Sequence, residues 1–199
     1  ACIGEAFQVA DDIKDATGDA LIVAAFQTLA VHAIHNVRAE RVPLVLSILA
    51  RGVGAPHGIA AGQAWECEPS VDVARSHRAK TGALFIAATC AGAASAGVDP
   101  GPWVSLGACI GEAFQVADDI KDATGDAEAL GKPVGIDAKL GRPNAVQEHG
   151  LDGAADRLKL LMEEGLESVP YCSGRESLVR CVRAQSERFI PETIGRSAA

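Results

Sequence analysis

Aromatic residues are scarce in this chain. Only 4% of its 199 residues are Phe, Trp or Tyr, although 48% are hydrophobic. Ala, Leu, Ile, Val and Gly must therefore fill the interior, which favours closely packed helices over a β-sandwich. Successive β-branched runs with period-two alternation, the mark of strands, are also missing. We predict an all-α protein.

Positive charge is in short supply as well. The chain has 18 Lys and Arg against 26 Asp and Glu, which gives a net charge of −8. This excludes generic nucleic-acid binding, because such binding depends on a basic face that neutralises phosphates. An acidic protein with an anionic substrate needs a local group of cations or a bridging metal ion instead.

Several familiar motifs are absent. The chain has no HExxH, G-x-S-x-G, Walker loop or Rossmann glycine fingerprint. Its six cysteines form no CxxC pair, so we expect reduced thiols in a cytoplasmic protein. The start has neither Met nor a basic segment, so we expect no signal peptide and a chain that is a fragment or a processed form.

Charged side chains are missing from two long stretches, residues 20–37 and 81–98. Their length alone would allow a membrane span. The first contains Gln27 and two histidines, and the second consists mostly of small residues. We interpret both as buried helices and predict no stable membrane insertion.

Glycine and proline divide the chain into segments of helical length. Asp99-Pro100-Gly101-Pro102 is the clearest break, and residues 131–143 should be a loop. The expected helices cover residues 3–15, 19–36, 43–54, 57–68, 71–96, 103–124, 151–168 and 176–190, with a frayed tail at 195–199.

One block of twenty residues occurs twice. Residues 1–20 read ACIGEAFQVADDIKDATGDA, and residues 108–127 repeat them letter for letter. Two widely separated copies do not fit a solenoid, whose repeats are roughly 20 to 50 residues long. Diverged structural repeats do not stay identical, so a recent duplication, an engineered junction or an error in joining the chain explains the block.

Each copy places three carboxylates at i, i+1 and i+4. In the second copy these are Asp118, Asp119 and Asp122, and Phe114 and Gln115 precede them on the same broad helical face. Three adjacent carboxylates repel one another unless a cation lies among them, and Mg²⁺ takes such oxygen ligands together with waters and substrate phosphates. The alternative is a solvated acidic face. The preceding Phe-Gln and the Gly-Lys-Pro that follows favour the metal site.

Four further polar side chains are candidates for the same site. Lys80 and Thr81 begin the second uncharged stretch, where an ammonium and a hydroxyl can hold a phosphate oxygen. The alternative is a lysine that snorkels at a helix boundary. Lys132, in GKPVGID, offers a second cation on a loop. Gln63, in AGQAWE, either bridges helices or faces the site.

Together these motifs resemble those of the trans-polyprenyl diphosphate synthases. GEAFQVADDIKD followed by GDAEALGKPVGID is similar to the second aspartate-rich region of that family, and GDALIVAAFQTLA, GIAAGQAWE, HRAKTGALF and RPNAV resemble further family segments. The likeness is closest to bacterial geranylgeranyl diphosphate synthases of pigment biosynthesis. We expect residues 18–199 to be the C-terminal part of a polyprenyl synthase domain and 1–17 to be a duplicated segment outside the family register.

The resemblance implies a fold and a reaction. The fold would be an isoprenoid synthase-type barrel of helices around a central apolar cavity, incomplete here, in a homodimer formed through residues 19–36 and a neighbouring helix. The reaction would be the condensation of isopentenyl diphosphate with an allylic diphosphate, in the cytoplasm, for carotenoid biosynthesis.

The resemblance also implies a role for each candidate residue. Asp118, Asp119 and Asp122 would hold Mg²⁺ on the allylic diphosphate, and Lys80 and Lys132 would contact that diphosphate directly. Thr81, Gln115 and Gln63 would line the reacting end, and the ring of Phe114 would support this face.

The family's first aspartate-rich motif has no counterpart in its usual place. Asp11, Asp12 and Asp15 imitate it, but they lie immediately before the Gly18-Asp19 pair, whereas the family motif lies much further upstream. We expect this segment to be filler. Two alternatives to an active synthase stay open: a non-catalytic partner subunit derived from the family, and a class I terpene cyclase, against which KTG and GKPVGID argue.

Overall fold

The structure is a computed structural model. It describes residues 17–18, 20–31, 33, 38–65, 68, 78–124 and 144–186, with the backbone alone for Arg78, Lys80 and Ser186. The chain divides into two compact units, Ala1–Ser47 and Ile48–Ala199. Within the described residues every regular element is a helix, which confirms the all-α prediction. The first unit holds the helical residues 17–18, 20–31 and 33, and the candidate site lies in the second.

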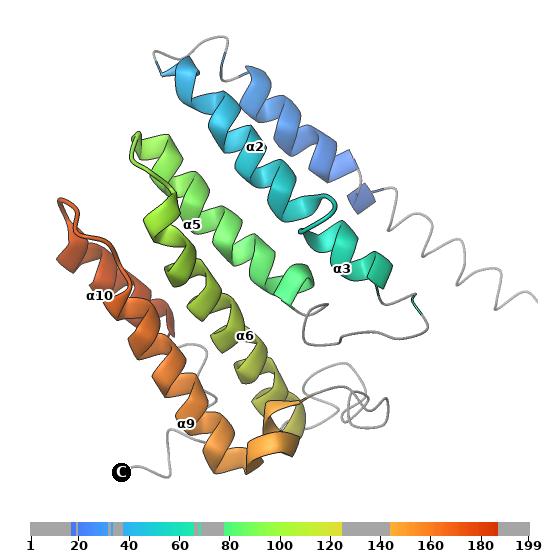
Figure 1. The fold of residues 1–199 in the computed structure, drawn as a ribbon, viewed down its shortest axis with the longest axis vertical. Helices are drawn as coiled ribbons and strands as arrows, with labels where there is room; N and C mark the ends of the chain where they lie inside the picture. Colours follow the sequence, from blue (N-terminus) through green and yellow to red (C-terminus); the bar gives the residue numbers. More distant parts are fainter. Residues whose placement is uncertain are drawn as a thin grey trace, which may run out of the picture. The chain divides into compact units, whose positions relative to one another are not determined.

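The elements follow the expected segments closely (Figure 1). The helix predicted at 3–15, the loop at 131–143 and the tail at 195–199 lie outside the described residues. The elements are η1 (Ala39–Arg41), α2 (Val42–Val53), α3 (Ile59–Trp65), η2 (Arg78–Gly82), α5 (Ala83–Ala96), η3 (Gly101–Trp103), α6 (Val104–Thr124), α9 (Ala145–Glu167) and α10 (Arg175–Ser186).

The helix α6 is the centre of the second unit. It packs against α5 on one side and α9 on the other, and α10 packs against α9 (Figure 1). The largest fully buried side chains are Ile120, Leu158 and Leu161, which lie in the seam between α6 and α9. Burial of side chains of this size stabilises a fold by about 1.5–3 kcal/mol each. This seam therefore fixes the acidic end of α6 against α9.

Glycines allow α5 and α6 to approach each other closely. A Cβ added at Gly107 would lie 2.5 Å from Ile86 Cα, and one at Gly111 would lie 2.9 Å from Gly82 Cα. Backbone cannot move aside as a flexible side chain can, so no larger residue fits at either position.

In the stretch 81–98, Ala87, Ala93 and Ala94 are buried, as the sequence indicated. The prediction that the stretch 20–37 is buried as well is wrong for its described part, where Leu21 and Val23 are exposed.

The helix ends explain where the boundaries were predicted well and where they were not. After α5, Gly97 adopts a φ of 80° and its amide bonds to the Ala94 carbonyl, which ends the helix before the predicted Asp-Pro-Gly-Pro break. The predicted start at 151 falls directly after a break in α9, and the sequence missed only the short helical piece before it, which Asn144 caps and which begins at Ala145. Gly150, with a φ of 72°, then kinks α9.

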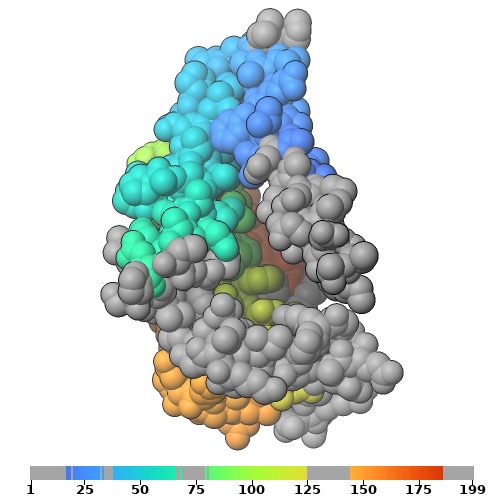
Figure 2. All heavy atoms as spheres, turned by 90° about the vertical axis from the view of Figure 1, so that its right-hand side faces the viewer, coloured from blue at the N-terminus to red at the C-terminus, as the bar shows by residue number. Residues whose placement is uncertain are grey.

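The first turns of α9 lie at the surface, in orange in Figure 2, and Leu151 there is 40% exposed.

Among the helices in the described ranges, none combines the length and the apolar character that a membrane crossing requires.

Candidate active site

One stripe of α6 joins a pocket to the acidic residues. Ala108, Gly111 and Gln115 line a pocket of about 360 Å³. Asp118 and Asp122 follow Gln115 at i+3 and i+7, which keeps them on the same face of the helix. The pocket wall therefore continues into the two half-buried carboxylates.

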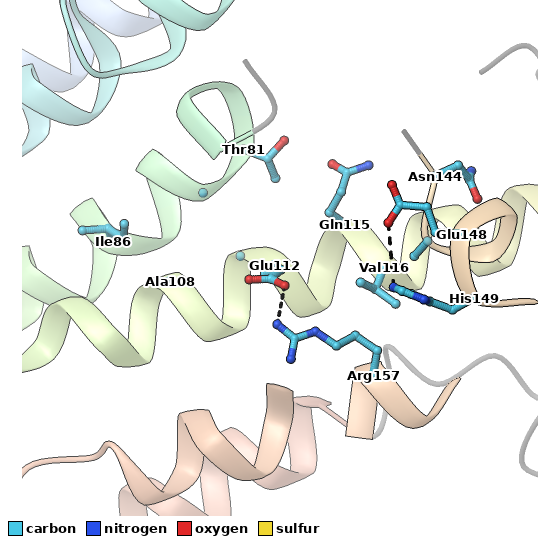
Figure 3. Close-up of a pocket in the computed structure, with 13 residues that line it drawn as sticks. Thr81, Ile86, Ala108, Glu112, Gln115, Val116, Asn144, Glu148, His149 and Arg157 are labelled. Atoms are coloured by element: carbon cyan, nitrogen blue, oxygen red, sulfur yellow. Dashed lines mark hydrogen bonds and ion pairs between the residues drawn. The ribbon is translucent and has the colours of Figure 1, made fainter. Parts of the chain in front are cut away.

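Three helical segments form the rest of the pocket wall (Figure 3). Thr81 and Ile86 come from η2 and α5, and the first turn of α9 contributes further polar side chains. The lining residues are Thr81, Gly82, Ile86, Ala108, Gly111, Glu112, Gln115, Val116, Asn144, Ala145, Glu148, His149 and Arg157. Thr81 and Gln115, far apart in the sequence, are thus brought to one pocket, as a shared site requires.

One ion pair and one histidine–glutamate pair stand in this wall. Arg157 Nη2 donates to Glu112 Oε1 at 2.7 Å and so links α9 to α6, as the dashed line in Figure 3 marks. This hydrogen bond raises the pKa of Arg157 above its ordinary value, against the opposing effect of burial. His149 Nε2 lies 3.8 Å from Glu148 Oε2, and both of these side chains are exposed. The wall therefore contains cationic and anionic groups within one small volume.

The cysteine nearest this wall is not a reactive thiol. Burial raises the pKa of Cys109, and the nearby Glu164 and Glu112 carboxylates raise it further, while Arg157 opposes them. A thiol whose pKa is raised stays protonated near neutral pH and is a poor nucleophile. The four cysteines in the described part of the chain, Cys90, Cys109, Cys172 and Cys181, are all free.

The three aspartates have different surroundings. Asp119 is 8% exposed, whereas Asp118 and Asp122 are half-buried. Gln115 Nε2 donates to Asp119 Oδ1 at 3.3 Å, and the Ala145 amide donates to Asp119 Oδ2 at 2.9 Å. The Asp119 carboxylate thus bonds to the first residue of α9.

The other predicted residues lie at or beside this region to different degrees. Phe114 contacts Phe85 in a tilted arrangement, with ring centroids 5.4 Å apart and an interplanar angle of 42°, and Phe114 remains 38% exposed. Gln63 is exposed on α3, outside the pocket lining, but α3 packs against η2, the segment that holds Thr81. The side chain of Lys80 and all of Lys132, Asp11, Asp12 and Asp15 lie outside the described residues.

Comparison with known proteins decides the family. The sequence profile described as polyprenyl synthetase matches residues 16–172. The chain belongs to the polyprenyl synthetase family. It is 49% identical over 178 residues to a geranylgeranyl diphosphate synthase of Cereibacter sphaeroides, and 45% identical over 173 residues to one of Rhodobacter capsulatus. These alignments cover 89% and 87% of this chain but 61% and 59% of the relatives, so the chain spans about three-fifths of their length.

A solved polyprenyl-type structure shares the fold. The geranyltransferase of Helicobacter pylori, solved with magnesium and isoprenyl diphosphate, superposes with a TM-score of 0.65 at 25% identity. The match covers 86% of this chain and 58% of that one. The family and the all-α fold inferred from the sequence are therefore confirmed.

The oxygen donors of this family member suit a hard divalent cation. In the part of the chain that the structure describes, no group of three or more His, Cys, Asp and Glu residues is arranged to hold a metal ion. Mg²⁺ needs fewer than three protein ligands, since one or two carboxylates with substrate phosphates and waters complete its octahedron. Asp118 and Asp122, one helical turn apart beside the pocket, fit that requirement.

Several pocket residues were missed by the sequence analysis. Asn144 carried a usable signal, because Asn immediately before a helix is a common N-cap. Glu112, one turn before Gln115, stood inside the quoted motif and shares the broad pocket face of α6. Arg157 had no local signal, since its partner Glu112 lies 45 residues away.

Proposed function

We propose that this chain carries the allylic-diphosphate and magnesium site of a geranylgeranyl-type diphosphate synthase, which condenses isopentenyl diphosphate with an allylic diphosphate. The observation that carries this proposal is the stripe on α6 that runs from the pocket at Gln115 to Asp118 and Asp122. The names of the two bacterial relatives and the ligands of the Helicobacter pylori structure support it.

In the proposed mechanism the acidic trio on α6 forms the metal-binding wall, and Lys80 and Lys132 contact the diphosphate. Magnesium ions, when bound, offset the negative charge that builds on the leaving diphosphate. Thr81 and Gln115 orient the reacting end of the allylic chain, with Gln63 nearby and Phe114 as support for this face.

Exclusion of water is the second requirement. An allylic cation reacts readily with water, so the carbon chain must be held against apolar walls. Ile86, Gly111 and Val116 provide such a wall in the pocket. The departing diphosphate accepts the final proton, and no histidine is needed for that step.

The first test removes one carboxylate from the proposed metal wall. Asp118→Ala should weaken magnesium-dependent binding of dimethylallyl diphosphate by at least about 100-fold, since ligand substitution costs more than the 10- to 100-fold typical of outer residues. Isothermal titration calorimetry measures this, and Asp152→Ala on the exposed face of α9 is the charge-matched control. Unchanged affinity in Asp118→Ala would contradict the assignment.

The cellular setting is part of the same proposal. We propose a cytoplasmic homodimer that contributes to carotenoid-type pigment synthesis, with residues 18–199 as the family part and 1–17 outside its register. The free thiols support a reducing compartment. Exposed apolar side chains at Leu21 and Val23, 66% and 65% exposed, support a subunit contact through this helix.

A further inference from the structure

Two glutamates line the pocket in addition to the aspartates that follow it on α6. Glu112 stands one turn before Gln115 on α6, and Glu148 stands in the first turn of α9. Both belong to a chain whose net charge is −8. Under the proposed function the ligand of this pocket is itself an anion, and like charges within one small volume repel each other. A diphosphate pocket with these carboxylates therefore needs a positive side chain in its own wall.

Arg157 meets that need. Among the described residues that line the pocket, it is the only lysine or arginine. Arg157 Nη2 donates to Glu112 Oε1 at 2.7 Å, whereas Glu148 is paired with His149 at 3.8 Å. A guanidinium is always charged, but a histidine is charged only when it is protonated. Glu112 is therefore the wall carboxylate whose charge has a permanent counter-charge.

The pair lies where a ligand would sense its net charge. In Figure 3 the Arg157 guanidinium reaches from α9 to the Glu112 carboxylate on α6, within the pocket wall. Both side chains are partly exposed, so neither charge is shielded in the interior. The hydrogen bond to Glu112 raises the pKa of Arg157, and the Glu164 carboxylate raises it further. Glu164 is not among the residues that line the pocket, so Glu112 is the partner that bears on a ligand there.

We propose that Arg157 is a positioning residue, which holds the Glu112 carboxylate against α9 and cancels its charge, so that the pocket accepts an anionic diphosphate chain. The inference rests on the proposed function for its ligand. Loss of the Arg157 charge would leave Glu112 as an unmatched carboxylate in the wall, which repels the ligand. Loss of the Glu112 charge would instead leave a free cation, which attracts it.

The test measures the magnesium-dependent affinity for dimethylallyl diphosphate by isothermal titration calorimetry at low ionic strength. Arg157→Met should weaken the affinity and Glu112→Gln should tighten it, each by roughly 3- to 10-fold, as expected for one unit charge near the ligand in a partly solvated wall. The double variant should return to the wild-type affinity, because this part of the wall is neutral again. Glu164→Gln is the matched control and should stay close to wild type.

A purely structural role for Arg157 gives a different pattern. If the pair only joined α6 to α9, the double variant would bind as weakly as Arg157→Met, and that result would overturn the proposal. The proposal also fails if the loss in Arg157→Met keeps the same size at high salt, because salt screens the effect of a charge at a solvent-exposed site.

Glu112→Gln and Glu164→Gln both keep Arg157, so they test the proposal even if Arg157→Met does not fold. Equal affinity in these two variants would contradict the charge balance at Glu112. A wild-type chain that binds dimethylallyl diphosphate no better with magnesium than without it would refute the proposed function itself, and this outcome is distinct from the others because it needs no variant.

Discussion

Two ion pairs that involve α9 differ in how far solvent reaches their side chains. The Arg157 and Glu112 side chains are 36% and 54% exposed at an N–O distance of 2.7 Å. Lys159 and Asp156, also on α9, are 56% and 78% exposed at 3.4 Å. Solvent screens both pairs, but the first has the shorter contact and joins two helices.

A double-mutant cycle on Arg157→Met and Glu112→Gln should therefore give a coupling free energy of about 0.2–1 kcal/mol. The same cycle on Lys159→Met and Asp156→Asn, the internal control, should give a smaller value, because that pair is longer and both of its side chains are more exposed. Urea unfolding of each set measures the coupling. Equal coupling in the two cycles would contradict a link between α6 and α9 through Arg157.

Some residues of the site could be predicted from the sequence, whereas their surroundings could not. Thr81 and Gln115 were identified from their motifs, and both line the pocket. The different surroundings of Asp118 and Asp119 were not foreseen, because spacing on one helix does not reveal the neighbouring helix. Ala145, which bonds Asp119, lies 26 residues later in the chain.

At the scale of helices, α9 shows how a single glycine divides a helix. Gly150, with φ 72° and ψ 172°, interrupts the helical conformation directly before the predicted helix start at 151. Backbone angles in that region are essentially restricted to glycine. Segments without such a bend, such as α6, were predicted almost to the residue, because hydrophobic periodicity and the flanking Pro-Gly break agree.

Gly150→Ala should lower the free energy of unfolding by about 1–3 kcal/mol, since a Cβ is strained at this φ and ψ. The control is Gly92→Ala in α5, where nothing lies within 4 Å of an added Cβ and the backbone is ordinary helix. That variant should gain about 0.4–1 kcal/mol. Thermal and urea unfolding measure both, and a stabilising Gly150→Ala would show that the bend is not required.

At the scale of the molecule, the family and the fold class could be predicted because several segments that resemble the family occur in the family's order. Local hydrophobic pattern alone would not have identified the family. Family and all-α class followed from them. The duplicated block 1–20 lies almost entirely outside the described residues, so its prediction as filler stays a prediction. The exposed apolar side chains of residues 20–31 favour association between copies of the chain, and the net charge of −8 opposes it.

If the chain forms a homodimer through residues 19–36, Val23→Lys should shift it toward monomer, because a charge on a buried subunit contact is strongly unfavourable. Leu160→Lys is the control, since Leu160 is 46% exposed on α9, away from this helix in the sequence. Sedimentation velocity measures the change. A wild-type monomer, or equal dissociation in both variants, would contradict the proposed subunit contact.

The glycine seam between α5 and α6 has a consequence for attempts to alter substrate scope. Gly111 belongs both to that seam and to the pocket lining, and the backbone of Gly82 stands directly opposite. A bulkier residue there would push two helices apart instead of filling the cavity. Under the proposed function, a change of the accepted carbon chain should therefore start from Ile86, which is half-buried, and not from Val116, which is buried in the core between α6 and α9.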